Sequence, residues 1–287
     1  MQAESIADTA YWVAYYRAVE TERPDALFHD PYARLLAGAR GEQFAASLHN
    51  PFVAGIIAQR TVVFDELVLR LINDDNVDLV LNLAAGLDTR PYRLRLPAQL
   101  RWVEVDLPDT LSYKQRILTN EQPACHLESL GLNLSHASVR RQLFAHINSE
   151  AKQALVLSEG LLLYLPPDEV ANLARDLHAQ PHFSYWLTDV MSPASLQMMV
   201  ANVGERFEAA DAPLRFAPEQ GADFFPPYGW TMTKRRPAFA EMRRLKRLPP
   251  MMAAFAALLG AAPSRDARSI DGTILLTRLP TPEEEAP

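Results

Sequence analysis

A glycine and an aspartate mark the first candidate site in this sequence. The apolar run from Val77 to Leu83 ends in Ala-Ala-Gly86, and a polar segment follows it. This pattern is typical of a buried parallel strand that ends in a tight turn, where small residues let the backbone approach a ligand. The next predicted strand ends at Asp106, twenty residues after Gly86. A carboxylate at that position can accept hydrogen bonds from both ribose hydroxyls, so the spacing predicts a nucleoside-cofactor site.

The glycine pattern argues against a bound pyrophosphate. A dinucleotide-binding turn requires Gly-x-Gly-x-x-Gly, whereas Ala84, Gly86 and Thr89 occupy these three positions here. S-adenosylmethionine has no phosphate, and its carboxylate needs a cationic partner. Arg60, which lies in an apolar stretch of the helix predicted over 51–72, can supply that charge or extend its head group to water instead. S-adenosylmethionine is therefore favoured, with a nicotinamide cofactor or no cofactor as alternatives.

Strand and helix patterns alternate through most of the chain. Strands are predicted at 78–83, 101–106, 124–128, 154–158, 183–190, 241–247 and 273–279. This order predicts an α/β fold of the Rossmann-like type, with a mostly parallel seven-stranded sheet and helices on both faces. We expect residues 1–76 to form an N-terminal helical segment that helps to cover the site, 77–280 to form the cofactor-binding core, and 281–287 to be a disordered acidic tail.

Residues 192–230 interrupt this alternation and predict a lid inserted after the fifth strand. A connection of this length within a compact domain is usually a lid or a binding loop. Its second half concentrates aromatic residues, namely Phe216, Phe224, Phe225, Tyr228 and Trp230. These rings are expected either to enclose a flat, apolar acceptor or to fill the core between the segment and the sheet.

Composition excludes several classes of protein. The 287 residues carry a formal net charge of −7, which disfavours a nucleic-acid partner. The single cysteine, Cys125, allows no disulfide framework, and the seven histidines show no metal-ligand spacing. We see no signal-peptide pattern and no apolar run long enough to span a bilayer, so we expect a cytoplasmic protein without a membrane partner. Two basic clusters, 234–236 and 243–247, indicate either a solvated face or a surface that attracts an anionic substrate.

Four segments, in order and at compatible spacings, resemble the leucine carboxyl methyltransferase family. They are Arg60-Thr61 and the stretches 82–90, 104–108 and 158–166. They resemble in particular its bacterial small-molecule branch, which includes polyketide carboxyl- and O-methyltransferases. The resemblance runs from about Ser5 to Asp189 and more loosely to Leu279, and it implies a class I methyltransferase fold with S-adenosyl-L-methionine as cofactor.

The resemblance also implies roles for individual residues. Arg60 is similar to the arginine that binds the methionyl carboxylate of the cofactor, and Arg17 to a second basic residue that reaches the same group. Gly86 resembles the turn glycine beneath that end of the ligand. Asp106 resembles the acid that binds the ribose, although its carboxylate could instead be a helix or turn cap. Glu159 resembles the acid near the methionyl ammonium and the reacting sulfonium, with a surface acid at a strand end as the alternative.

One position departs from the family pattern. The family usually has Asp-Leu after the third strand, where the acid binds the adenine amino group, and this chain has Asn133-Leu134. An asparagine can still accept that hydrogen bond through its amide oxygen, so we expect adenine binding to be retained with somewhat lower affinity.

Methyl transfer is an in-line displacement, so the protein mainly has to align the acceptor and exclude water. A carboxylate acceptor needs no base, and no arrangement of residues identifies one. We therefore expect transfer to a carboxylate or acidic hydroxyl of a small, apolar, polyketide-type acceptor, with Tyr164 facing it or, alternatively, packed in the core. An NAD(P)-dependent oxidoreductase, a non-catalytic nucleotide-binding regulatory protein, and a protein or RNA methyltransferase are the other hypotheses.

Overall fold

The computed structural model describes residues 8–48, 51–209, 212–258 and 270–281. A single seven-stranded sheet organises these residues, with the strands in the order β3-β2-β1-β4-β5-β7-β6. The strands are β1 (Leu79–Leu83), β2 (Arg101–Asp106), β3 (His126–Gly131), β4 (Ala154–Ser158), β5 (Phe183–Val190), β6 (Trp230–Pro237) and β7 (Gly272–Arg278). Strands β1 to β5 are parallel, and β7 is antiparallel to both of its neighbours. The predicted mostly parallel α/β sheet is confirmed.

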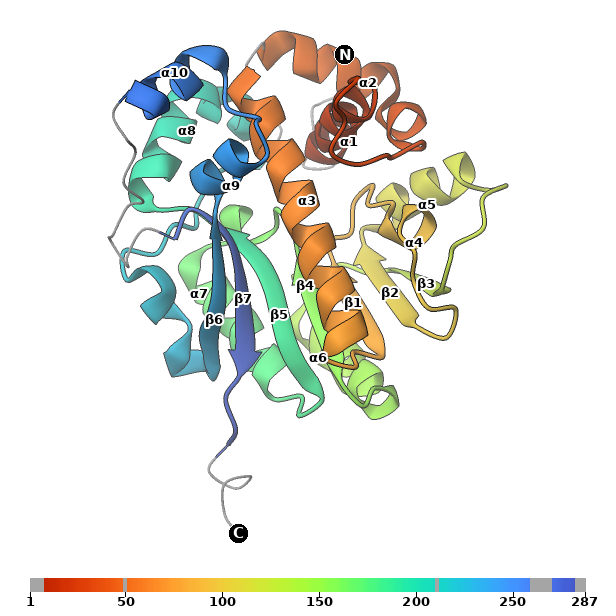
Figure 1. Ribbon diagram of the computed structural model, residues 1–287. Coiled ribbons are helices and arrows are strands. Elements are labelled where there is room, and N and C mark those ends of the chain that lie inside the picture. Colours follow the sequence, from red (N-terminus) through yellow and green to blue (C-terminus); the bar gives the residue numbers. More distant parts are fainter. Residues whose placement is uncertain (1–7, 49–50, 210–211, 259–269, 282–287) are drawn as a thin grey trace.

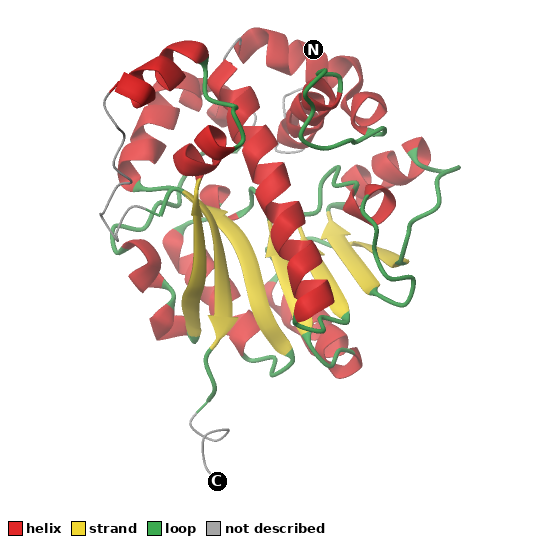
Figure 2. Ribbon diagram, viewed as in Figure 1, coloured by secondary structure: helices red, strands yellow, loops and turns green. Residues whose placement is uncertain are grey.

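The helices cover both faces of this sheet (Figure 1). They are α1 (Asp8–Thr21), α2 (Ala33–Leu48), α3 (Pro51–Asp74), α4 (Arg90–Arg93), α5 (Pro108–Ile117), α6 (Ala137–Glu150), α7 (Pro167–His178), α8 (Pro193–Ala209), α9 (Ala238–Arg244) and α10 (Pro250–Leu258). Helix α3 packs on one face through Val63, Phe64 and Leu67, and α6 and α7 pack on the other. Figure 2 shows that α1, α2, α8, α9 and α10 gather at the end of the sheet where the parallel strands terminate.

Alternating strand residues explain why both faces are apolar. In β1, Val80 contacts the α3 side, whereas Leu79 and Leu81 contact the α6 and α7 side, as the two-residue period of a strand requires. Cys125 is buried in the cluster on the α3 side, where burial raises the pKa of its thiol to about 11. In the part of the chain that the structure describes, no helix is long and apolar enough to cross a membrane.

The strand predicted at 241–247 is wrong, because the edge strand lies earlier in the chain. The edge strand is β6, and the segment after it forms α9. Residues 230–233 read Trp-Thr-Met-Thr, which favours a strand, whereas Ala, Glu, Met and Arg after Pro237 are good helix formers. Pro237 lies directly before α9, where its fixed φ suits a helix start.

The aromatic residues of the 192–230 segment belong to the core, which is the second of the two alternatives that the sequence leaves open for these rings. Phe216, Phe225 and Trp230 are at most 1% exposed and lie in the cluster between the sheet and α7. Trp230 Nε1 donates to the carbonyl of Ala174 at 2.9 Å, and its ring meets Trp186 edge-on. The rings therefore fill the space between α7 and the antiparallel end of the sheet.

Three arginines of the two basic clusters, Arg236, Arg244 and Arg247, are paired with carboxylates, and the exposed members of the clusters are Arg243, Arg244 and Lys246. Arg236 and Arg244 both contact Glu66 of α3 and Glu241 of α9. Arg247 binds Glu20 of α1 at 2.7 Å, across a sequence separation of 227 residues. These pairs connect the last helices to the first ones. The predicted acidic tail falls on residues 281–287, nearly all of which lie outside the described residues.

Candidate active site

A cavity of about 1180 Å³ opens at the end of the sheet where the parallel strands terminate. Its wall includes residues of α1, α3, α8, α9 and α10, of the start of β7, and of the segments that follow β1 to β5. All eight residues predicted from the sequence line it: Arg17, Arg60, Gly86, Asp106, Asn133, Leu134, Glu159 and Tyr164. Ligands of open α/β sheets bind at this edge, so the cavity is the candidate active site.

The turn after β1 is joined to the end of β2 through Asp106. Ala84 and Gly86 both have positive φ, 51° in each case, which lets the chain turn sharply at the cavity wall. Asp106 accepts one hydrogen bond from the Gly86 N–H at 2.6 Å and another from the Leu107 N–H, also at 2.6 Å. Burial raises the pKa of Asp106, although these two N–H groups partly offset that effect. The structure therefore brings Gly86 and Asp106, which were predicted from the sequence, into direct contact.

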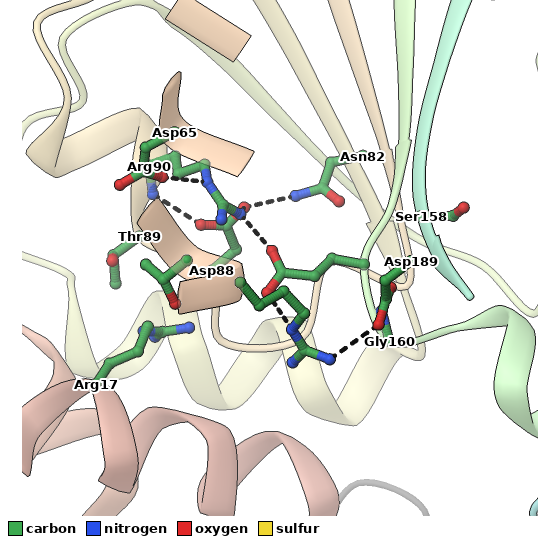
Figure 3. A network of polar contacts seen from close by, with 12 residues as sticks. Arg17, Asp65, Asn82, Asp88, Thr89, Arg90, Ser158, Gly160 and Asp189 are labelled. Carbon is green, nitrogen blue, oxygen red and sulfur yellow. Dashed lines mark hydrogen bonds and ion pairs between the residues drawn. The ribbon is translucent and has the colours of Figure 1, made fainter. Parts of the chain in front are cut away.

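Glu159, at the end of β4, connects two arginines, of which Figure 3 labels Arg90. Its Oε1 lies 2.9 Å from Arg60 Nε, and its Oε2 lies 2.8 Å from Arg90 Nη1. Arg60 Nη1 also donates to Asp189 Oδ2 at 3.1 Å, at the end of β5. Burial would raise the pKa of Glu159, but Arg90 and Arg60 outweigh it and hold that pKa below its usual value. For Asp189 burial dominates over Arg60, and its pKa is raised.

Arg17 pairs with Asp30 and with the turn after β1. Its Nε lies 2.9 Å from Asp30 Oδ2, and its Nη2 donates to the carbonyl of Leu87 at 2.5 Å. Arg17 is buried, and Glu20, which lies one helical turn further along α1, pairs with Arg247. Arg17 therefore fixes α1 against the turn after β1 and still lines the cavity.

Asn133 and Tyr164 lie on the cavity wall in the segments that follow β3 and β4. Asn133 follows β3, is exposed, and accepts a hydrogen bond from the Ser135 N–H through Oδ1 at 3.0 Å. A second lone pair on that oxygen can accept from a ligand. Tyr164 follows β4, and burial raises the pKa of its phenol to about 12, with Thr9 and Arg60 opposing.

Sequence reasoning missed several members of the ion-pair network in Figure 3. Arg90 is 3% exposed and contacts Asp65 at 2.7 Å and Asp88 at 2.9 Å, in addition to Glu159. Asp189 shares with Asp106 a signal that could have identified it, namely an acid near the end of a buried strand. No such signal exists for Asp65, because its role depends on how α3 crosses the sheet. Among the described residues, no group of His, Cys, Asp and Glu is placed to hold a metal.

Comparison with known proteins agrees with this geometry. The family model for leucine carboxyl methyltransferases matches residues 10–178. A candidate S-adenosyl-L-methionine-dependent methyltransferase of Streptomyces coelicolor is 31% identical over 269 residues, which cover 87% of this chain and 92% of the relative. A second candidate of the same class, from Mycobacteroides abscessus, is 36% identical over 60% of this chain and 61% of its own length. The chain belongs to the leucine carboxyl methyltransferase family.

The fold agrees with a solved structure as well. The structure of a candidate methyltransferase from Thermobifida fusca superposes with a TM-score of 0.56 at 17% identity, over 97% of this chain and 96% of that one. Identity this low bears on the fold alone, and the shared fold is that of class I methyltransferases.

Proposed function

We propose that this chain is an S-adenosyl-L-methionine-dependent O-methyltransferase that acts on a small, largely apolar acceptor. The contact between Asp106 and the Gly86 turn carries the cofactor half of the proposal. It places a carboxylate and a close backbone approach side by side on the cavity wall, in a chain whose turn lacks the glycines for a pyrophosphate. Family membership supports the same cofactor.

The donor and acceptor groups on the wall fit this cofactor. The two N–H groups on Asp106 use two of its roughly four lone-pair sites, so the carboxylate can still accept both ribose hydroxyls. Arg60 has more N–H donors than Glu159 and Asp189 use, and we assign it to the methionyl carboxylate, together with Arg17. Glu159 then lies near the methionyl ammonium. Asn133 and Leu134 are assigned to the adenine.

The acceptor half of the proposal rests on the remaining wall of the cavity. Val13, Ile56, Met198, Met199 and Phe239 give that side an apolar surface. No histidine of the described chain lines the cavity, and both Glu159 and Asp189 are held by arginines. An acceptor that arrives already ionised, as a carboxylate or an acidic hydroxyl does, needs no base from the protein.

When bound, the cofactor supplies an electrophilic methyl group on a sulfonium. The residues of this chain orient the acceptor oxygen in line with that methyl group and exclude water from it. Tyr164, on the wall beside Arg60, is the residue that we assign to the acceptor. With a pKa near 12 its phenol stays protonated at neutral pH, so its role is to donate a hydrogen bond.

Calorimetric titration with S-adenosylmethionine, its demethylated product S-adenosylhomocysteine, and NAD tests the cofactor assignment. Asp106→Ala should weaken binding of both adenosyl ligands by roughly 1.5–3 kcal/mol, the size of hydrogen bonds to a charged group. Asp109→Ala, an exposed acid three residues along the chain, is the matched control and should leave affinity unchanged. Tight binding of NAD, or equal affinities in all three proteins, would contradict the assignment.

The acceptor class can be tested with cofactor that carries a labelled methyl group. Incubation with a panel of apolar carboxylic acids and phenols should label an organic-soluble product. A methyl ester releases its label in mild alkali, whereas a methyl ether keeps it, so this treatment distinguishes carboxyl from hydroxyl transfer. Label that appears only in protein or nucleic acid would rule out a small-molecule acceptor.

A further inference from the structure

Two buried side-chain oxygens on the cavity wall have no hydrogen-bond partner in the described structure. They are the amide oxygen of Gln59, on α3, and the hydroxyl of Thr273, on β7. The two residues are only 2% and 0% exposed, and both line the cavity. A buried polar group without a partner is costly, and in native proteins such groups are few, so a pair on one ligand cavity calls for an explanation.

Both groups lie next to the ion pair between Arg60 and Asp189. Asp189 is directly opposite Thr273 in the ladder between β5 and β7, so their side chains leave the sheet on the same face. Two residues along, Leu187 and Leu275 pair in the same way and pack in the cluster with α3. Thr273 therefore faces α3, and on that helix Gln59 directly precedes Arg60, whose guanidinium binds Asp189.

The position within the sheet assigns this pair to the acceptor and not to the cofactor. The residues that we assign to the ribose and the turn follow β1 and β2, whereas Thr273 is on β7, which lies beyond both β4 and β5. Ala238, Phe239 and Met252, from α9 and α10, line the cavity as well. This side therefore combines an apolar wall with two unsatisfied polar atoms.

We propose that Gln59 and Thr273 form a polar subsite that selects an acceptor bearing a hydroxyl group in addition to the oxygen that is methylated. The amide oxygen of Gln59 can only accept, so its ligand must supply an O–H or N–H donor, and the hydroxyl of Thr273 can donate to the same group or accept from it. A purely apolar body would leave both atoms unsatisfied and lose affinity for that reason. The inference rests on the proposed function, because it describes a second contact of the same acceptor.

Apolar substitutions of similar size test the subsite without knowledge of the natural acceptor. Gln59→Leu and Thr273→Val remove polar atoms that have no partner, so neither should lower the melting temperature of the free protein. The matched control is Thr188→Val, on neighbouring β5, where the buried Thr188 hydroxyl donates to the carbonyl of Ser158 at 2.9 Å. This variant should melt at a lower temperature. A drop for Gln59→Leu or Thr273→Val as large as that of the control would show a structural role and overturn the proposal.

Binding of matched ligand pairs tests the selectivity. The probes are benzoate against its three monohydroxy derivatives, and octanoate against 3-hydroxyoctanoate, titrated into protein saturated with S-adenosylhomocysteine. The wild type should bind at least one hydroxylated member roughly five- to tenfold more tightly than its parent, and the Gln59→Leu/Thr273→Val double variant should lose that preference. A preference that persists in the double variant, equal affinities in the wild type, or no binding of any probe would overturn the subsite.

A measurement of cofactor affinity distinguishes failure of the subsite from failure of the proposed function on which it rests. S-adenosylhomocysteine should bind the wild type and the double variant equally, because the two residues lie on the acceptor side. A loss of affinity in the double variant alone would reassign the pair to the cofactor and overturn the subsite while the proposed function stands. No binding to the wild type would instead overturn the proposed function itself, and the subsite with it.

Discussion

At the scale of single residues, the charges around the cavity are held in fixed pairs before any ligand arrives. Glu159 contacts Arg60 and Arg90 with one oxygen each, and Asp189 contacts Arg60 from the other side. A buried charge is tolerated when it is paired and hydrogen-bonded, and pairs of this kind need little reorganisation during a reaction. The network therefore orients Arg60 at the cavity wall without leaving it uncompensated.

Tyr164 provides a prediction about pH. Burial raises the pKa of its phenol to about 12, so the neutral form persists well above the pH at which a free tyrosine ionises. We expect Tyr164→Phe to lower kcat roughly tenfold, the value of one hydrogen bond, while the shape of the pH–rate profile between about pH 7 and 10 stays the same. Rates measured across this range for both proteins check it. An alkaline rise that the wild type shows and the variant lacks would instead identify a phenolate base.

At the scale of elements, a matched pair of phenylalanines separates the core from the acceptor wall. Phe225 is fully buried behind the sheet, whereas Phe239, on α9, lines the cavity and is 42% exposed. Phe225→Ala should cost roughly 3–5 kcal/mol of stability, because a large core side chain is removed. Phe239→Ala should barely change the melting temperature and should raise the acceptor KM. Thermal melts and steady-state kinetics on both variants check the prediction, which fails if the two behave alike.

Much of the sheet could be predicted from sequence because its strands are buried on both faces and read as short apolar runs. Strands β2, β4 and β5 have the predicted bounds. The edge strand β6 could not be found in this way, since half-exposed residues such as Lys234 give it no apolar run. The aromatic residues after α8 were ambiguous for a related reason, because a ring looks the same in sequence whether it packs in a core or in a pocket.

The candidate site was predictable where its residues follow strand ends, because the ends of parallel strands meet at one edge of the sheet. Asp106 and Glu159 occupy such positions, and both line the cavity. Partners that arrive from elsewhere were not predictable. Asp65 and Gln59 lie in the middle of α3, and only the path of that helix across the sheet brings them to Arg90 and to the cavity.

At the scale of the whole molecule, Arg247 connects the C-terminal helices to the N-terminal ones through an ion pair. Its guanidinium is buried and contacts Glu20 of α1, which is also buried. We expect Arg247→Met to destabilise the protein by about 3 kcal/mol, because the buried carboxylate of Glu20 then keeps only Arg23, 3.8 Å away, as a cationic neighbour. Denaturant unfolding measures the change.

Two further variants test the cause of that loss. Adding Glu20→Gln to Arg247→Met removes the buried charge and should restore part of the stability. Arg70→Met is the control, because this arginine is 42% exposed in its side chain and lies 3.6 Å from Asp75 near the surface, so the change should stay within roughly 1 kcal/mol. Equal losses of stability in Arg247→Met and Arg70→Met would mean that burial of the Arg247–Glu20 pair does not make it more important than a surface pair.

Because Cys125 is buried, the folded chain should react little with thiol reagents, which makes it suitable for site-directed labelling. It is the only cysteine of the 287 residues, and with a thiol pKa of about 11 it carries almost no thiolate at neutral pH. A maleimide dye should therefore modify the folded protein slowly and the unfolded protein fast. A cysteine introduced by Met251→Cys, on α10 at a side chain that is 86% exposed, would then be the single reactive position. Fluorescence from that dye could follow whether α10 moves when cofactor and acceptor enter the cavity.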